Sequence, residues 1–140
     1  MMSTVFGTLS TDLKTPLAAV LTAATWYEGA PPDVLPPPTS AVGYVWVDES
    51  ERLDSDHLLQ QVQAFVRYYP VQADKADPET PIDPSPLYQA RDDIMTTLMP
   101  AQRTSDSSWF FEVTATKIDH DNQLVDATIL ATGPNTFALA

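Results

Sequence analysis

The sequence lacks cysteine, and it has few glycines. Its 140 residues include no cysteine and only four glycines. Without cysteine the chain forms no disulfide and offers no thiol nucleophile. Neither GxGxxG nor GxxxxGK[ST], the glycine-rich patterns that hold phosphate groups, occurs in it. No GxSxG pattern frames a serine nucleophile either. The sequence therefore predicts that the protein is not an enzyme and holds no cofactor.

Basic residues and long apolar runs are also scarce. Seven Lys and Arg stand against 19 Asp and Glu, which gives a net charge of −12. Such a chain repels a phosphate backbone and an anionic membrane surface. The most apolar stretch, residues 16–24, is too short to cross a bilayer, and the N-terminus has no signal-peptide pattern. We expect a soluble, unexported protein that binds neither a membrane nor a specific nucleic-acid sequence.

What the sequence does contain is enough apolar material for one domain over residues 1–140, with 44% hydrophobic residues. The clearest pattern is in residues 107–133, where two alternating runs flank the polar turn Asp119 to Asn122. This pattern predicts a β-hairpin. The residues expected on its apolar face are Trp109, Phe111, Val113 and Ala115 in the first run and Val125, Ala127, Ile129 and Ala131 in the second.

Two further strands and two helices are expected. Residues 41–48 alternate as a strand, with Val42, Tyr44 and Trp46 on one face. Residues 57–72 fit a strand or a helix by periodicity, and their β-branched and aromatic residues favour a strand over about 59–71. Ser85-Pro86 is typical of a helix start and predicts a helix over 86–98. Together these elements predict an α+β fold, with a mostly antiparallel sheet of four to five strands packed by two helices.

The first helix is expected over residues 16–27, because Thr15-Pro16 resembles a helix start and Gly29 is placed to end it. Val5, Leu9 and Leu13 form a stripe that also allows an earlier start, with a kink at Pro16. The C-terminal residues 134–140 are mildly apolar, and they either contact a neighbour or fray.

Proline-rich loops are expected at about 30–40 and 74–86. The first has five prolines in eleven residues, which excludes a helix interior or a central strand. This segment fits either a stiff surface connector or a PxxP ligand for an aromatic groove. The connector is favoured because it is the more common use of such a segment.

Two histidines lie in acidic surroundings that allow a metal site. His120 stands between Asp119 and Asp121, with Asp126 nearby, and His57 follows Asp54 and Asp56. Aspartate and asparagine are also the ordinary residues of turns, because their side chains bond to nearby backbone groups. The turn interpretation is favoured at both places, so no structural metal is expected.

Aromatic residues are numerous, and several of them are neighbours in the chain. Core packing is expected for most of them, although an aromatic ligand platform is the alternative. Adjacent residues of a strand point to opposite faces, so one of each pair is exposed or is buried by a second layer, such as another subunit. The aromatic residues concerned are Trp26, Tyr27, Trp46, Tyr68, Tyr69, Trp109, Phe110 and Phe111.

The order of expected elements resembles the tail-terminator and tail-completion proteins of long-tailed bacteriophages, and more loosely their neck proteins. The similarity covers most of the chain, although its proline-rich segments are longer than the compact loops usual in that family. It rests on four stretches: TWYEGAPPDVLPPPTSAVGYVWVDE, QQVQAFVRYYPVQ, SPLYQARDDIMTTL and SSWFFEVTATKIDHDNQLVDATI.

The resemblance implies a structural virion protein. Family members form rings, usually of six subunits, that cap the finished tail tube and join it to the head. The implied partners are further copies of the chain, the tail tube protein and the head–tail connector protein, and DNA passes through the lumen. An acidic ring suits that passage, since it repels DNA. The alternatives are a head-side connector or stopper, a non-viral adaptor that binds protein or a small ligand beside the hairpin, and, last, a hydrolase with an unrecognised site.

Overall fold

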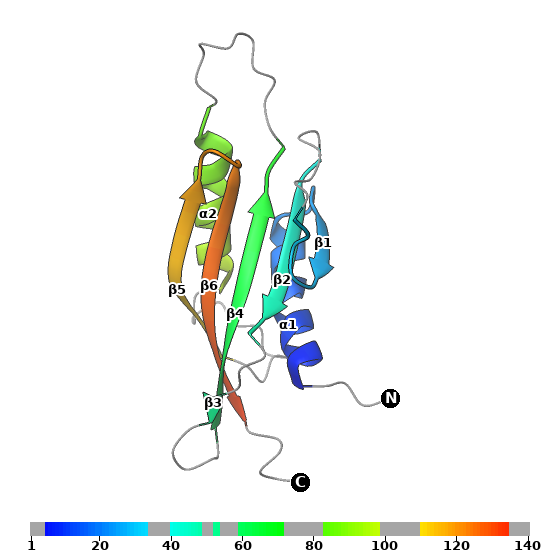
Figure 1. The fold of residues 1–140 in the computed structure, drawn as a ribbon, viewed down its shortest axis with the longest axis vertical. Coiled ribbons are helices and arrows are strands. Elements are labelled where there is room, and N and C mark those ends of the chain that lie inside the picture. Colours follow the sequence, from blue (N-terminus) through cyan, green and yellow to red (C-terminus); the bar gives the residue numbers. More distant parts are fainter. Residues whose placement is uncertain are drawn as a thin grey trace.

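The computed structural model describes residues 5–33, 40–48, 52–53, 59–71, 83–98 and 110–134. These residues form two helices and six strands (Figure 1). In chain order the elements are α1 (Val5–Val20), β1 (Thr25–Glu28), β2 (Val42–Val47), β3 (Arg52–Leu53), β4 (Leu59–Tyr69), α2 (Ser85–Leu98), β5 (Phe110–Asp119) and β6 (Leu124–Pro134).

The strands form one mixed sheet in the order β1-β2-β4-β6-β5, and the short strand β3 also pairs with β4. Strands β1 and β2 are parallel, whereas the other pairs are antiparallel. Both helices lie on the same side of the sheet (Figure 1). The predicted α+β fold, with its mostly antiparallel sheet and two helices, is confirmed.

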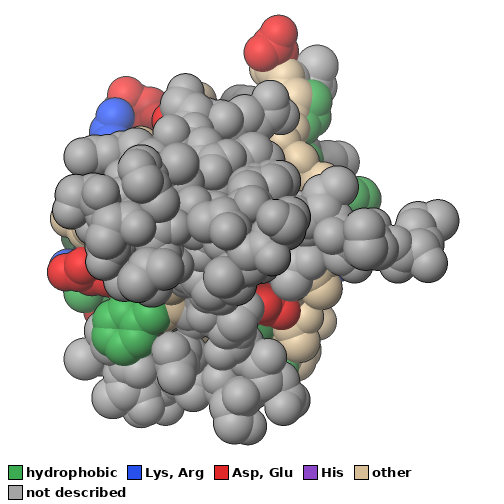
Figure 2. Space-filling model, turned by 90° about the horizontal axis from the view of Figure 1, so that it is seen from below, with side chains coloured by type: hydrophobic (Ala, Val, Ile, Leu, Met, Phe, Trp, Pro, Cys, Tyr) green, Lys and Arg blue, Asp and Glu red, His purple; other side chains and the backbone are tan. Residues whose placement is uncertain are grey.

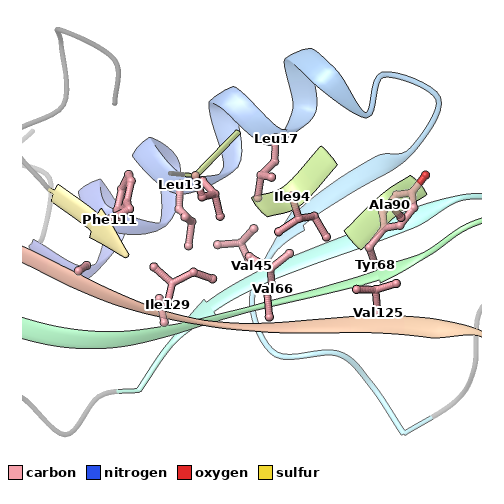
Figure 3. Close-up of a cluster of buried hydrophobic side chains, with 14 of the residues drawn as sticks. Leu13, Leu17, Val45, Val66, Tyr68, Ala90, Ile94, Phe111, Val125 and Ile129 are labelled. Atoms are coloured by element: carbon pink, nitrogen blue, oxygen red, sulfur yellow. The ribbon is translucent and has the colours of Figure 1, made fainter. Parts of the chain in front are cut away.

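The hydrophobic core lies between the two helices and one face of the sheet (Figure 3). Leu9, Leu13 and Leu17 recur every four residues on α1, and all three are fully buried. The buried residues of α2 are Leu87, Ala90, Ile94 and Leu98. The sheet adds every second residue of its central strands, which gives Val45 from β2, Val62, Ala64, Val66 and Tyr68 from β4, and Val125, Ala127, Ile129 and Ala131 from β6.

Helix α1 differs from the predicted helix over 16–27. It begins at Val5 and ends at Val20, with Pro16 inside it, so the earlier start is the correct alternative. Burial of the leucine stripe outweighs the local preference of Thr15-Pro16 for a helix start. The Thr15 hydroxyl donates to the Thr11 carbonyl oxygen at 2.8 Å. Residues 25–28 form β1 instead, and Gly29 follows a strand and does not end a helix.

The hairpin of β5 and β6 is confirmed with one correction. Its turn lies between Asp119 and Leu124, as predicted, but a β-bulge interrupts β5 between Val113 and Ala115. The extra residue reverses the alternation beyond it. Ala115 therefore pairs with Thr128 on the exposed face, whereas it was expected on the apolar face with Phe111.

The remaining expected elements are confirmed where the structure describes them. The strand expected over about 59–71, within the ambiguous segment 57–72, is β4 over Leu59–Tyr69, and the expected helix over 86–98 is α2. The expected strand over 41–48 is β2. Residues 34–39, most of 74–86 and 135–140 lie outside the described residues.

Strand β1 is held against β2 by an aromatic ring that occupies the space over a glycine. Trp26 lies beside Gly43 in the parallel register, and its ring stacks on Tyr68 with 5.9 Å between centroids. The Trp26 indole N–H donates to the Leu21 carbonyl oxygen at 3.1 Å. A Cβ atom on Gly43 would overlap the Trp26 ring. Glycine is therefore required at this position by close approach.

We predict that Gly43→Ala lowers the free energy of unfolding by about 1–3 kcal/mol, because the new methyl group displaces the Trp26 ring. Urea unfolding measures this change. In a Trp26→Leu background the same glycine substitution should cost less, since the two residues are coupled. An equal cost in both backgrounds would contradict the contact.

Candidate functional site

One face of the sheet is turned away from α1 and α2, and we call it the open face (Figure 1). Its side chains alternate with those of the core along each strand. The register between neighbouring strands shows which of these side chains lie opposite one another on the open face. The open face includes Tyr27 of β1, Val42, Tyr44 and Trp46 of β2, Phe65, Arg67 and Tyr69 of β4, Phe110, Glu112, Ala115 and Lys117 of β5, and Asp126, Thr128 and Leu130 of β6.

Five aromatic rings lie together on the β1, β2 and β4 part of this face. Tyr27 stacks on Tyr44 with 5.6 Å between ring centroids, and Tyr44 meets Tyr69 edge-on at 6.2 Å. Trp46 stacks on Phe65 at 5.4 Å. Pairs of this kind contribute about 0.5–1.5 kcal/mol beyond their buried area. The aromatic residues are therefore already ordered within one copy of the chain.

An ion pair stands beside the aromatic residues. Arg67 of β4 lies directly opposite Asp126 of β6. Its Nε and Nη2 atoms donate to the two carboxylate oxygens at 2.7 and 3.0 Å. The hydrogen bond to Asp126 raises the pKa of Arg67 above its usual value. The guanidinium also lies 6.0 Å from the centroid of the Trp46 ring, so the pair fixes a planar cation at the centre of the open face.

The open face is unevenly exposed. Val42 and Tyr69 are buried, at 8% and 5% exposure, whereas Trp46, Phe65 and Arg67 are half-buried. Tyr27 and Phe110 are 51% and 42% exposed. Desolvation, followed by the nearby phenols of Tyr69 and Tyr27, raises the pKa of Tyr44. Hydrophobic side chains also reach the surface beside Asp and Glu at the end of the molecule seen in Figure 2.

The predicted division of neighbouring aromatic residues between two faces is confirmed for three pairs. Each pair sends one ring toward the helices and the other to the open face: Trp26 and Tyr27, Tyr68 and Tyr69, and Phe111 and Phe110. Trp109 lies outside the described residues. Of the three outward rings, Tyr27 and Phe110 are exposed, as cover by a second layer would require, whereas Tyr69 is already buried within the chain.

The residues weighed as metal ligands at His120 form a turn. The Asp119 carboxylate accepts hydrogen bonds from the Asn122 backbone N–H at 3.1 Å and from its Nδ2 atom at 3.0 Å. These two bonds lower the pKa of Asp119. Gln123, at φ 54°, donates from Nε2 to the His120 carbonyl oxygen at 2.7 Å. In the part of the chain that the structure describes, no three such residues gather as metal ligands. His57, Asp54 and Asp56 lie outside that part.

Sequence reasoning did not find the Arg67–Asp126 pair. Alternation along residues 59–71 puts Arg67 and Phe65 on one face, and alternation along 125–131 puts Asp126 on the polar face. The register between the two strands, which brings the two charges together, is not encoded in either pattern alone. Only the pairing of β4 with β6 reveals it.

No known protein family matches the sequence, and no curated protein matches it closely enough to indicate a relative. Among the described residues, no helix is long and apolar enough to cross a lipid bilayer. The open face has the chemistry of a protein-binding surface. Aromatic residues and arginine are enriched in the centres of protein interfaces, where they are desolvated on binding.

We predict that Asp126→Ala lowers the free energy of unfolding by about 1 kcal/mol, because it leaves the half-buried Arg67 without its bidentate partner while water still screens the charge. Chemical denaturation measures the loss. Asp121→Ala, an exposed acidic residue in the adjacent turn, is the matched control and should change stability by less than about 0.5 kcal/mol. Equal losses in the two variants would contradict a role for the ion pair.

We also predict that the protein holds no structural metal. The Asp119 carboxylate is engaged by Asn122 within the turn, which supplies the order that a metal would otherwise provide. The melting temperature should therefore be unchanged when EDTA is added. A fall of several degrees on chelation would overturn this prediction.

Proposed function

We propose that the chain is a structural virion protein, a bacteriophage tail terminator. It self-associates into a ring of six subunits at the end of the tail tube. The observation that carries the proposal is the open face, where ordered aromatic residues and a fixed ion pair are turned away from both helices. A sheet face of this kind is typical of a surface that a second protein layer covers.

The order of the elements also supports the proposal. Helix α1, strand β2, the long strand β4, helix α2 and the closing hairpin follow one another in the order on which the resemblance rests, and β1 and β3 are additional strands. The partners are then other copies of the chain, the tail tube protein and the head–tail connector protein. The site of action is the head-proximal end of the tail, after assembly in the host cytoplasm.

The two sides of the domain differ, and this difference is compatible with the contacts of a ring. A ring contact joins one surface of a subunit to a different surface of the next, and it closes when the rotation permits. The open face and the helical side are two such different surfaces. The net charge of −12 also suits a ring through which DNA slides, because an acidic lumen does not hold the phosphate backbone.

We predict that deletion of the gene from the parent phage leaves filled heads without tails beside separate tails, many of them abnormally long, in electron micrographs of the lysate. Such tails are expected because nothing would then stop tube growth or join tube to head. Normal infectious particles would rule out the proposal. Unstable, DNA-leaking heads beside tails of normal length would favour a head-side connector or stopper instead.

A further inference from the structure

Strand β5 is a long edge strand. Nine of its ten residues pair with β6 on one side, Thr114 being the extra residue of the bulge, and no described strand pairs with it on the other. It lies at the border of the sheet, with α2 behind it (Figure 1). Val113 and Ile118 of this strand are only partly buried against the core. An edge of this length presents a row of backbone N–H and C=O groups that can pair with another strand.

The β-bulge makes the facing pattern of β5 symmetric. Read outward from the midpoint between Thr114 and Ala115, both halves of the strand show the same alternation. The side chains that face the core are Phe111, Val113, Thr116 and Ile118. Those that face away from it are Phe110, Glu112, Ala115, Lys117 and Asp119, and Thr114 in the bulge is exposed. If two copies of a strand without the bulge paired antiparallel about this midpoint, residues that face the core in one copy would lie opposite residues that face away from it in the other.

Because of this symmetry, two copies of β5 can pair antiparallel about a two-fold axis at the midpoint. Glu112 then lies opposite the partner's Lys117, and the same pair forms again on the other side of the axis. On the core side, Phe111 lies opposite the partner's Ile118. Opposite charges and apolar pairs in directly opposed positions are both favourable across antiparallel strands.

We propose that β5 is a homodimerisation edge, occupied by β5 of a second copy of the chain. The sheets of the two copies then form one continuous sheet. Side chains of the partner cover Val113 and Ile118, which are only partly buried in one copy. A bulge usually turns an edge strand away from a partner. Here it lies on the symmetry axis, so the residues on either side of it remain regular strand and pair with the other half of the partner.

The dimer does not depend on the proposed ring. A two-fold contact uses the same patch on both copies and closes at two, so it differs from a contact that repeats around a ring. Edge pairing also buries less area than the roughly 1,000 Å² expected of a stable complex, and the association is therefore weak. It should be measured by sedimentation velocity at concentrations up to about 0.5 mM, where a complex of micromolar affinity is populated.

The charges test the register of the pairing. Glu112→Lys places two lysines against each other twice per dimer and should weaken dimerisation roughly tenfold. Asp33→Lys, at an exposed position that follows β1 at the opposite edge of the sheet, changes the net charge equally and should not weaken it. The exchange variant, Glu112→Lys with Lys117→Glu, should recover much of the loss of dimerisation. Because Lys117 also lies opposite Asp126 within the chain, the melting temperatures of this variant and of Lys117→Glu alone are compared with that of the natural chain.

A cysteine supplies a second, independent readout, because the natural chain has none. Ala115→Cys lies next to the axis, so under oxidation it should give a disulfide-linked dimer and no larger species. Gln89→Cys on α2 is the control and should stay largely uncrosslinked. A chain that is monomeric at about 0.5 mM overturns the inference. An oligomer that neither crosslinks through position 115 nor weakens with Glu112→Lys overturns it as well, and neither result bears on the deletion phenotype.

Discussion

The structure depends on a simple constraint. Both described helices cover the same face of the sheet, and neither covers the other face. Inward positions of β4 and β6 are therefore buried, and all but Tyr68 are small or branched, whereas outward positions must be stable without a helix above them. On the inward side this gives close packing, as where Trp26 fills the space over Gly43. On the outward side it leaves aromatic rings stacked on one another and Arg67 neutralised by Asp126.

Much of the fold could be predicted from the sequence because alternation and helical stripes are local signals. The strand over Leu59–Tyr69 and helix α2 follow directly from them. The start of α1 was misplaced because a local helix-start signal at Thr15 competed with a leucine stripe whose burial is a tertiary effect. The bulge in β5 was missed because the alternation was followed only as far as Thr116; Val113 and Ile118 both face the core although they are five residues apart, which uninterrupted alternation does not allow.

The candidate site could be predicted only in outline. Neighbouring aromatic residues require that one of each pair leave the core, and this is a property of any strand. Which rings then meet depends on strand order, so the stacking of Trp46 on Phe65 needed the structure. The symmetry of β5 also appeared only with the register, because the bulge that creates it is a relation between two strands.

The central claim is that the open face is a contact between subunits in the assembled particle. Hydroxyl-radical footprinting of the dilute free chain and of purified tails tests it most directly, since the half-buried rings of Trp46 and Phe65 report on the centre of that face. The account predicts that both rings are modified in the free chain and protected in the tails. Equal modification in the two samples would contradict it.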